Sequence, residues 1–279
     1  MENPFEKSFI PVTSVNSGNL QEVAPDVSCF TIQVVNVSMV GHPDSGYGWV
    51  LVDAGMPRSA DNILKAVKER FGEDRAPEAI ILTHGHFDHV GGLLELVEHW
   101  GCPVYAHPLE MLYLTGHADY PEPDTSVEGG LGAKMAGMFP NEGIDLGKHV
   151  HELPADGTVP GLPDWRWVHT PGHTTGHISL FRGEDRFLIA GDAFITVKQE
   201  SLFKVLTQHK EISGPPRYLT PDWDAAYESV KKLANLHPAV AITGHGCPMG
   251  GQELTTSLEK LVIDFDKIAV PDYGRYVDD

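Results

Sequence analysis

Cysteine is scarce in this chain, and the few cysteines are poorly placed for any task that needs several of them. Three cysteines, Cys29, Cys102 and Cys247, are spread over 279 residues. An odd number with wide spacing argues against a disulfide framework and against a thiolate metal cage. We therefore expect these residues to be small members of the hydrophobic core.

Long apolar runs are also missing. No stretch approaches the roughly 18–20 residues needed to cross a bilayer, and residues 1–19 lack the basic and apolar blocks of a signal peptide. With 41% hydrophobic residues, the composition is that of an ordinary globular protein. The sequence predicts a folded, cytoplasmic protein without a membrane partner.

Positive charge is in short supply. Lys and Arg number 20 against 39 acidic residues, which gives a formal net charge of −19. Such a surface repels nucleic-acid phosphates at long range, so nucleic acid is excluded as the expected partner. The sequence also has no G-x-S-x-G nucleophile elbow, and a covalent-serine mechanism is therefore unsupported.

The hydrophobic pattern alternates between strand and helix character along the chain. It predicts strands at 29–40, 48–53, 79–82, 104–106, 165–169, 178–181, 187–190 and 239–243, and helices at 60–70, 93–100, 222–236 and 252–268. Residues 115–163 are rich in Gly and Pro and are expected to be a long loop or lid. We predict one α/β domain over residues 1–279, with a core at about 27–250 and helices outside the sheet.

The densest chemical signal is a run of histidines that follows the predicted strand 79–82. Four ligand-type side chains, His84, His86, Asp88 and His89, fall within six residues. Imidazole and carboxylate bind divalent zinc, manganese or iron without thiolates. Alternation places His84 and His86 on one side of an extended turn, so Asp88 and His89 can face a second metal past the bend.

Two metals need more ligands than this run supplies, and later strand ends offer three. His173, Asp192 and His245 each stand beside glycine, which lets the backbone turn tightly. Together with the first run they predict two divalent metal ions per chain, zinc being favoured over manganese, iron or cobalt.

The motif H-x-H-x-D-H, followed by T-P-G-H-T, G-D and G-H-G, resembles that of the metallo-β-lactamase superfamily. The resemblance spans residues 27–246. It implies an αββα sandwich, that is, two mixed β-sheets with helices on the outside and a dinuclear site at one sheet edge. It also implies that His84, His86 and His173 hold one metal, that Asp88, His89 and His245 hold the other, and that Asp192 bridges them.

The resemblance further implies that Asp53 supports the metal loop from behind the ligands. We expect His107 and His177, which lie near the motifs without matching a ligand position, to support the ligands or to pack beside them. Phe194 and Tyr218 are predicted to border the substrate. Lactonases of the acyl-homoserine type commonly carry a tyrosine shortly after the bridging aspartate, where this chain has Phe194.

The predicted reaction is the direct hydrolysis of an ester, lactone or thioester carbonyl in a small-molecule substrate by a metal-bridging hydroxide, with Asp88 as the catalytic group that moves the proton. True β-lactamases generally have Cys or Ser where Asp192 stands, so β-lactam cleavage is not expected. The alternatives are a phosphodiesterase or nuclease of the same superfamily and a catalytically silent metal-binding regulator. A homodimer is also an open alternative.

Overall fold

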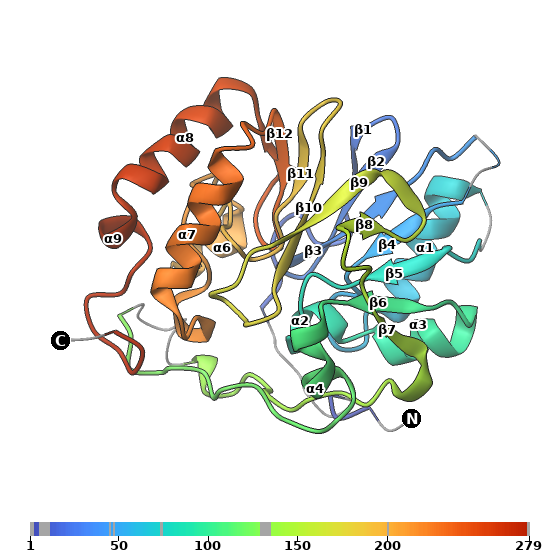
Figure 1. Cartoon of the computed structure of the whole chain (residues 1–279), viewed down its shortest axis with the longest axis horizontal. Helices are drawn as coiled ribbons and strands as arrows, with labels where there is room; N and C mark the ends of the chain where they lie inside the picture. Colours follow the sequence, from blue (N-terminus) through green and yellow to red (C-terminus); the bar gives the residue numbers. More distant parts are fainter. Residues whose placement is uncertain are drawn as a thin grey trace.

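Two β-sheets lie face to face with helices on their outer sides (Figure 1). The structure is a computed structural model, and it describes residues 3–5, 12–44, 46, 48–72, 75–128, 135–199 and 201–277. The predicted αββα architecture, an α/β fold of two mixed sheets with outer helices, is confirmed.

The first sheet has seven strands in the spatial order β1 to β7. They are β1 (Leu20–Ala24), β2 (Val27–Ile32), β3 (Val35–Val40), β4 (Val50–Val52), β5 (Ala79–Ile81), β6 (Val104–Ala106) and β7 (Val150–Glu152). Strands β1 to β4 form an antiparallel meander, and β4 to β7 run parallel to one another. The parallel half needs crossover connections, and helices supply two of them.

The second sheet has six strands in the order β13-β12-β11-β10-β9-β8. Its strands are β8 (Thr158–Val159), β9 (Leu162–His169), β10 (Ile178–Arg182), β11 (Phe187–Ile189), β12 (Val240–Ile242) and β13 (Met249–Gly250). Only β11 and β12 pair in parallel, and the other neighbours are antiparallel.

Helices of the first half lie over the first sheet, and helices of the second half lie over the second sheet (Figure 1). The α-helices are α1 (Ala60–Phe71), α2 (Phe87–Val90), α3 (Leu93–Trp100), α4 (Met111–Leu114), α6 (Leu202–Thr207), α7 (Trp223–Ala234), α8 (Gly251–Ile263) and α9 (Phe265–Ile268). The 3-10 turns are η1 (Pro108–Glu110), η2 (Gly147–His149) and η3 (Arg217–Leu219).

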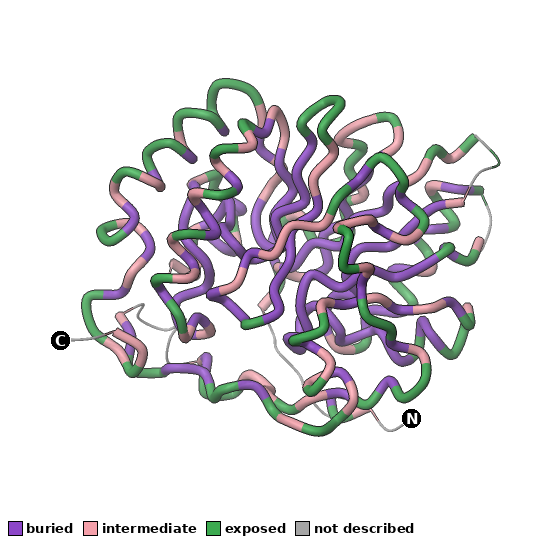
Figure 2. The backbone as a smooth tube through the Cα atoms, in the orientation of Figure 1, coloured by how far each residue is buried: buried purple, intermediate pink, exposed green. Residues whose placement is uncertain are grey.

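Alternation along the strands explains why both faces of each sheet are apolar. In β4, Leu51 packs with the layer that includes Ile63 of α1, whereas Val50 and Val52 belong to the layer between the sheets. In β11, Leu188 joins the layer under α7 and α8. Successive strand residues point to opposite faces, so a fully buried strand serves two hydrophobic layers. Figure 2 shows the resulting buried interior.

Three expectations about regular structure were wrong. The strand expected at 29–40 is two paired strands, β2 and β3, joined by a turn at residues 33–34, where Gln33 has a φ of 55°. Residues 150–152 and 158–159, inside the expected loop 115–163, form β7 and β8, because each short strand completes the edge of a sheet. Residues 129–134 of that loop lie outside the described residues. The helix expected at 252–268 is broken at Asp264 into α8 and α9, where φ is −113°.

Across the described ranges, no helix is both long and apolar enough to span a bilayer.

Candidate metal centre

The histidine run lies where the chain leaves the first sheet. His84 and His86 follow the C-terminal end of β5, and the single turn of α2 carries Asp88 and His89. His86 is still extended, with φ −64° and ψ 152°, so the chain bends immediately after it. The predicted change of direction between the two ligand pairs therefore has a structural cause, which is the start of a helix.

The remaining candidate ligands come from loops that follow strands of the second sheet. His173 follows β9, Asp192 follows β11 and His245 follows β12. Glycine is required beside these residues because other atoms approach its Cα closely. A Cβ atom on Gly244 would overlap Oδ1 of Asp192, so this position must lack a side chain if Asp192 is to reach the centre.

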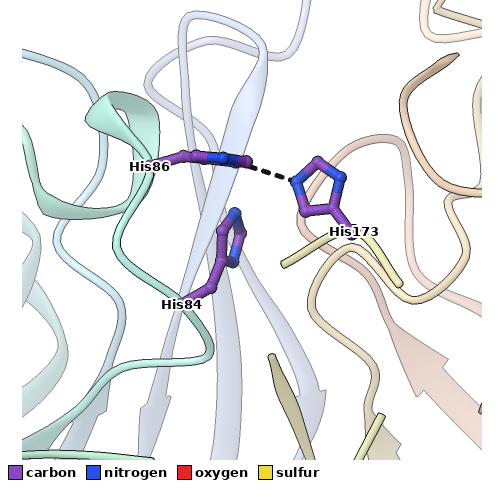
Figure 3. Close-up of side chains that lie close together, drawn as sticks. All are labelled: His84, His86 and His173. Carbon is purple, nitrogen blue, oxygen red and sulfur yellow. Dashed lines mark hydrogen bonds between the residues drawn. The ribbon is translucent and has the colours of Figure 1, made fainter. Parts of the chain in front are cut away.

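Three imidazoles form one half of the centre, which we call the imidazole half: His84, His86 and His173. Nδ1 of His86 lies 3.0 Å from Nε2 of His173, and His84 points toward the space between them (Figure 3). The ligand atoms of these three buried residues lie within 4.8 Å of one another. The structure thus brings together the three residues implied to hold one metal.

The other half, which we call the carboxylate half, consists of Asp88, His89 and His245. Its three ligand atoms also lie within 4.8 Å of one another. Nε2 of His245 is 3.3 Å from Oδ2 of Asp88. All three residues are buried, so the Asp88 carboxylate has little access to bulk water.

Asp192 lies between the two halves. Its Oδ2 is 3.5 Å from Nε2 of His173, 3.7 Å from Nε2 of His89 and 3.3 Å from Nε2 of His245. One carboxylate oxygen therefore faces ligands of both halves, which is the position that a bridging ligand requires.

Four of the histidines hold their Nδ1–H in hydrogen bonds directed away from the centre. The pairs are His84 with Thr83 Oγ1 (3.1 Å), His89 with Asp53 Oδ2 (2.9 Å), His173 with Thr220 Oγ1 (3.2 Å) and His245 with the carbonyl of Val34 (2.9 Å). Both hydroxyls donate elsewhere, Thr83 to Asp53 and Thr220 to the carbonyl of Pro216, so each can accept from the imidazole. The second nitrogen, Nε2, is then left as the inward-facing ligand atom.

Burial keeps the imidazole half neutral. It lowers the pKa of His84 and of His173 well below the ordinary value, and it lowers the pKa of His86 to about 4 despite the attraction of Asp88 and Asp192. A neutral imidazole is the form that binds a metal ion.

The carboxylate half behaves in the opposite way. Burial opposes a charge on His245, but Asp192 and Asp88 outweigh it and raise the pKa of His245 to about 10. Burial is likewise outweighed at His89, whose pKa is raised by Asp53, Asp192 and Asp88. This half therefore attracts positive charge.

The residues fit a pair of divalent cations. Among the described residues, the buried atoms without a hydrogen-bond partner include Nε2 of His84, Nε2 of His89 and Oδ1 of Asp192. Buried polar atoms without partners are costly, and those three all belong to the centre. A donor set of imidazole and carboxylate, with no thiolate, suits zinc, manganese, iron or cobalt.

Asp53 and His177 lie directly behind the candidate ligands. Asp53 accepts hydrogen bonds from the Thr83 amide and hydroxyl, both at 2.8 Å, in addition to the one from His89. Nε2 of His177 accepts from the amide of Asp192 at 2.9 Å, so it holds the bridging residue by its backbone.

His107 and Phe194 lie elsewhere than expected. The His107 ring stacks on His169 at 4.2 Å and meets Trp167 edge-on, and it contacts none of the ligands. Phe194 is fully buried in the hydrophobic layer between the second sheet and helices α7 and α8. An apolar residue after a buried strand packs into the core, and Phe194 is not among the residues that line the two cavities beside the centre.

Two cavities flank the centre, and Tyr218 and Leu219 line both. The first, which we call the apolar cavity, reaches Asp88 and His245. Its apolar walls include Met56, Phe87, Phe139, Leu202, Val205 and Leu219. The second, which we call the tyrosine cavity, reaches His86 and His173 and is lined by Tyr113, Tyr120, Tyr218 and Tyr276. Tyr218 donates to Oε1 of Gln199, another residue of the apolar cavity, at 2.6 Å.

The buried residues beside the centre that the sequence analysis missed include Thr83, Thr220 and Glu110. Glu110 is fully buried and bonds to both ligand-bearing loops of the imidazole half. Its position carried a signal, because it closely follows the predicted strand 104–106. The carboxyl ends of neighbouring parallel strands meet at one sheet edge, where ligands bind.

Comparison with known proteins places this site in a family. Residues 31–245 match the model of the metallo-beta-lactamase superfamily. The chain is 50% identical over 253 residues to the probable metallo-hydrolase YflN of Bacillus subtilis, covering 91% of this chain and 96% of that protein. It is 30% identical over 176 residues to a hydroxyacylglutathione hydrolase of Erwinia tasmaniensis, covering 61% of this chain and 55% of that protein.

Solved structures agree on the fold. The di-iron-bound form of TTHA1623 superposes with a TM-score of 0.52 and 27% identity, covering 77% of this chain and 89% of that one. BJP-1, a subclass B3 metallo-beta-lactamase of Bradyrhizobium japonicum, superposes with a TM-score of 0.59 and 20% identity, covering 92% and 94%. The ligand geometry, the two-sheet fold and the match over residues 31–245 lead to one conclusion: the chain belongs to the metallo-beta-lactamase superfamily.

Proposed function

We propose that this protein is a dinuclear metal-dependent hydrolase that cleaves the acyl C–O or C–S bond of a small ester, lactone or thioester, with zinc as the working metal. The observation that carries the proposal is the convergence of seven buried ligand residues. They are His84, His86, Asp88, His89, His173, Asp192 and His245. Their imidazole nitrogens and carboxylate oxygens form two adjoining sets around Asp192.

Divalent cations at such a centre supply Lewis-acid chemistry, since they lower the pKa of a water molecule and polarise a carbonyl oxygen. The protein provides the proton acceptor. Asp88 lines the apolar cavity, and its pKa is lowered by His89 and His245, which outweigh the effect of burial. An ionised carboxylate at the cavity wall can orient a water molecule and take up its proton.

The cavities favour an uncharged substrate with an apolar group. Among the described residues, no Lys or Arg lines either cavity, so a carboxylate or phosphate on the substrate finds no cationic side chain there. The apolar cavity reaches Asp88 and His245 and suits the hydrocarbon part of an acyl group. The tyrosine hydroxyls on the other side suit a polar alcohol or lactone oxygen.

Thioester cleavage remains part of the proposal because of the hydroxyacylglutathione hydrolase relative. The lack of lining Lys and Arg disfavours glutathione itself, which carries two carboxylates. Asp192 between the two halves also disfavours a main activity on β-lactams, by the resemblance described above.

The test combines metal analysis with a substrate panel. Purified protein should contain two metal ions per chain, and it should hydrolyse p-nitrophenyl esters or lactones with apolar acyl groups faster than charged thioesters or phosphodiesters. Dialysis against a chelator should abolish turnover, and added zinc should restore it. Two bound metals without turnover on any carbonyl substrate, or a clear preference for phosphodiesters, would overturn the proposed reaction.

A further inference from the structure

Glu110 is a buried carboxylate without a cationic partner among its described hydrogen bonds. It lies at the end of η1 and is fully shielded from solvent. Burial raises its pKa, and the hydrogen bonds that it accepts oppose that rise. Burying such a group is costly unless its oxygens are fully bonded, so the arrangement around it needs a reason.

Each oxygen of Glu110 holds a different loop. Oε2 accepts from the amide of Gly85 at 3.1 Å, and Gly85 lies between His84 and His86. Oε1 accepts from the hydroxyl of Thr174 at 2.7 Å and from the amide of Gly176 at 2.9 Å, in the loop that begins with His173. A single side chain thus joins the two loops that supply the imidazole half.

Tyr120 completes the arrangement. Its hydroxyl donates to Oε2 of Glu110, and its ring meets the ring of His86 edge-on at 4.5 Å. Tyr113 stacks on the outer face of Tyr120 at 4.0 Å. Glu110 therefore also fixes a side chain that packs against a ligand and lines the tyrosine cavity.

We propose that Glu110 is the positioning residue of the imidazole half, because its two oxygens set the separation of the loops that carry His86 and His173. Asp53, the other buried carboxylate behind the ligands, binds His89 of the carboxylate half directly and His84 of the imidazole half through Thr83. The described bonds of Glu110 reach only the loops of the imidazole half. This inference deepens the proposed metal centre and rests on it.

Glu110→Gln tests the role with little change in volume. The carboxamide of glutamine has one oxygen that can still accept a hydrogen bond, but its NH2 group replaces the second oxygen. The NH2 group then faces a donor of one of the two loops, and the hydrogen bonds to that loop are lost. We expect the affinity of the imidazole half for cobalt to fall about 10–100-fold, the range found when a supporting partner of a metal ligand is lost. The carboxylate half should change less than about threefold. Asp53→Asn is the comparison variant, and it should weaken both halves, the carboxylate half through His89 and the imidazole half through Thr83 and His84, so it should lack the selective loss of Glu110→Gln.

Because His173 and His245 each carry a hydrogen on Nδ1, one NMR signal is available for each half of the centre. Cobalt(II) is titrated into the metal-free protein, and the paramagnetically shifted Nδ1–H signals of His173 and His245 report the two halves separately. Circular dichroism and thermal unfolding establish that each variant is folded. Thr174→Val, which removes a single donor to Oε1, is the second variant if Glu110→Gln does not fold, and it should weaken the His173 response selectively.

Wild-type affinity at both halves of folded Glu110→Gln, or an equal loss at both, would overturn the inference about Glu110. Where Glu110→Gln does not fold, an unchanged His173 response in Thr174→Val would overturn it. A wild-type protein that binds no cobalt at either half would instead overturn the proposed function. The two failures are therefore distinguishable without any measurement of turnover.

Discussion

The imidazole half and the carboxylate half lie side by side around Asp192, yet their electrostatics are opposite. Burial holds the pKa of His86 at about 4, whereas two carboxylates raise the pKa of His245 to about 10. One half is therefore a set of neutral donors, and the other is an anionic pocket in which protonated histidine satisfies the carboxylates when no cation is bound. The difference shows that equal burial produces unequal sites when only one of them contains carboxylates.

The halves also face different surroundings. The imidazole half borders the tyrosine cavity, and the carboxylate half borders the apolar cavity. If both halves hold a cation, a substrate carbonyl at the centre has a hydroxyl-lined side and a hydrocarbon-lined side. The difference between the two halves of the centre therefore favours one orientation of a substrate that has a polar end and an apolar end.

Removal of the shared residue should have the largest effect, because Asp192 serves both halves. Asp192→Ala should lower kcat/KM at least about 10²–10³-fold. Without the bridging carboxylate the protein holds the metal ions less firmly, and these ions would stabilise the negative charge that develops on the substrate oxygen. Metal content should fall below two per chain. Plasma emission spectrometry and ester hydrolysis check both results. Wild-type values for metal content and turnover would contradict the shared role of Asp192.

The two halves should differ in how their metal affinity depends on pH. His245 and His89 must each lose a proton before they bind a metal, so the affinity of the carboxylate half should rise at least about tenfold per pH unit from pH 6.5 to about 10. The imidazole half should be nearly independent of pH in this range, because His86 is already neutral. Cobalt titrations at several pH values measure both slopes, and equal slopes would show that the halves do not differ in this way.

The apolar cavity should distinguish substrates by chain length. In the wild-type protein, kcat/KM should rise about fourfold for each CH2 added to the acyl group until the cavity is full, because each buried CH2 contributes about 0.8 kcal/mol. Leu202→Asn should flatten this rise. Phe203→Asn is the matched control, since Phe203 lies on the same helix but its side chain is exposed. A similar effect of both substitutions would argue against the cavity as the acyl site.

The last comparison concerns stability and His177. Burial lowers the pKa of His177 to about 3. Between pH 6.5 and about 3, this histidine is therefore protonated in the unfolded chain and neutral in the folded chain. Stability contributed by this group is present above pH 6.5 and is lost as the pH falls toward 3, by at most about 1.4 kcal/mol per pH unit. His177→Gln keeps an acceptor for the Asp192 amide without titrating. Urea unfolding of the metal-depleted proteins should therefore show a shallower acid slope for the variant, and identical slopes would contradict this assignment.

The sequence predicted the ligand residues better than their supports. His84 to His89, His173, Asp192 and His245 were identifiable because metal chemistry restricts residue types and glycine marks the turns beside them. Glu110 could not be identified in the same way, since it is one acidic residue among 39 and the residues that it bonds lie far away in the sequence. Phe194 was misplaced because a sequence motif does not show which side chains the core takes up.

Local regular structure followed the hydrophobic pattern where elements were long. Helix α1 agreed within one residue of its prediction because its buried face, Ile63, Ala66 and Val67, repeats at helical spacing and Gly72 ends it in the left-handed conformation. The two-residue strand β8 did not have enough residues to show a period. It is a strand only because β9 offers it an edge.

The sequence by itself determined the family, the two-sheet fold and the kind of ligands, because periodicity, glycine positions and ligand chemistry are local properties of the chain. Only the tertiary structure decided how the ligands divide electrostatically. The pKa of a buried histidine depends on which carboxylates the fold brings within a few ångströms, and His245 is reached by Asp88 from α2 and by Asp192 from the loop after β11. The same dependence on distant partners explains why Glu110 emerged as the support of the imidazole half only in three dimensions.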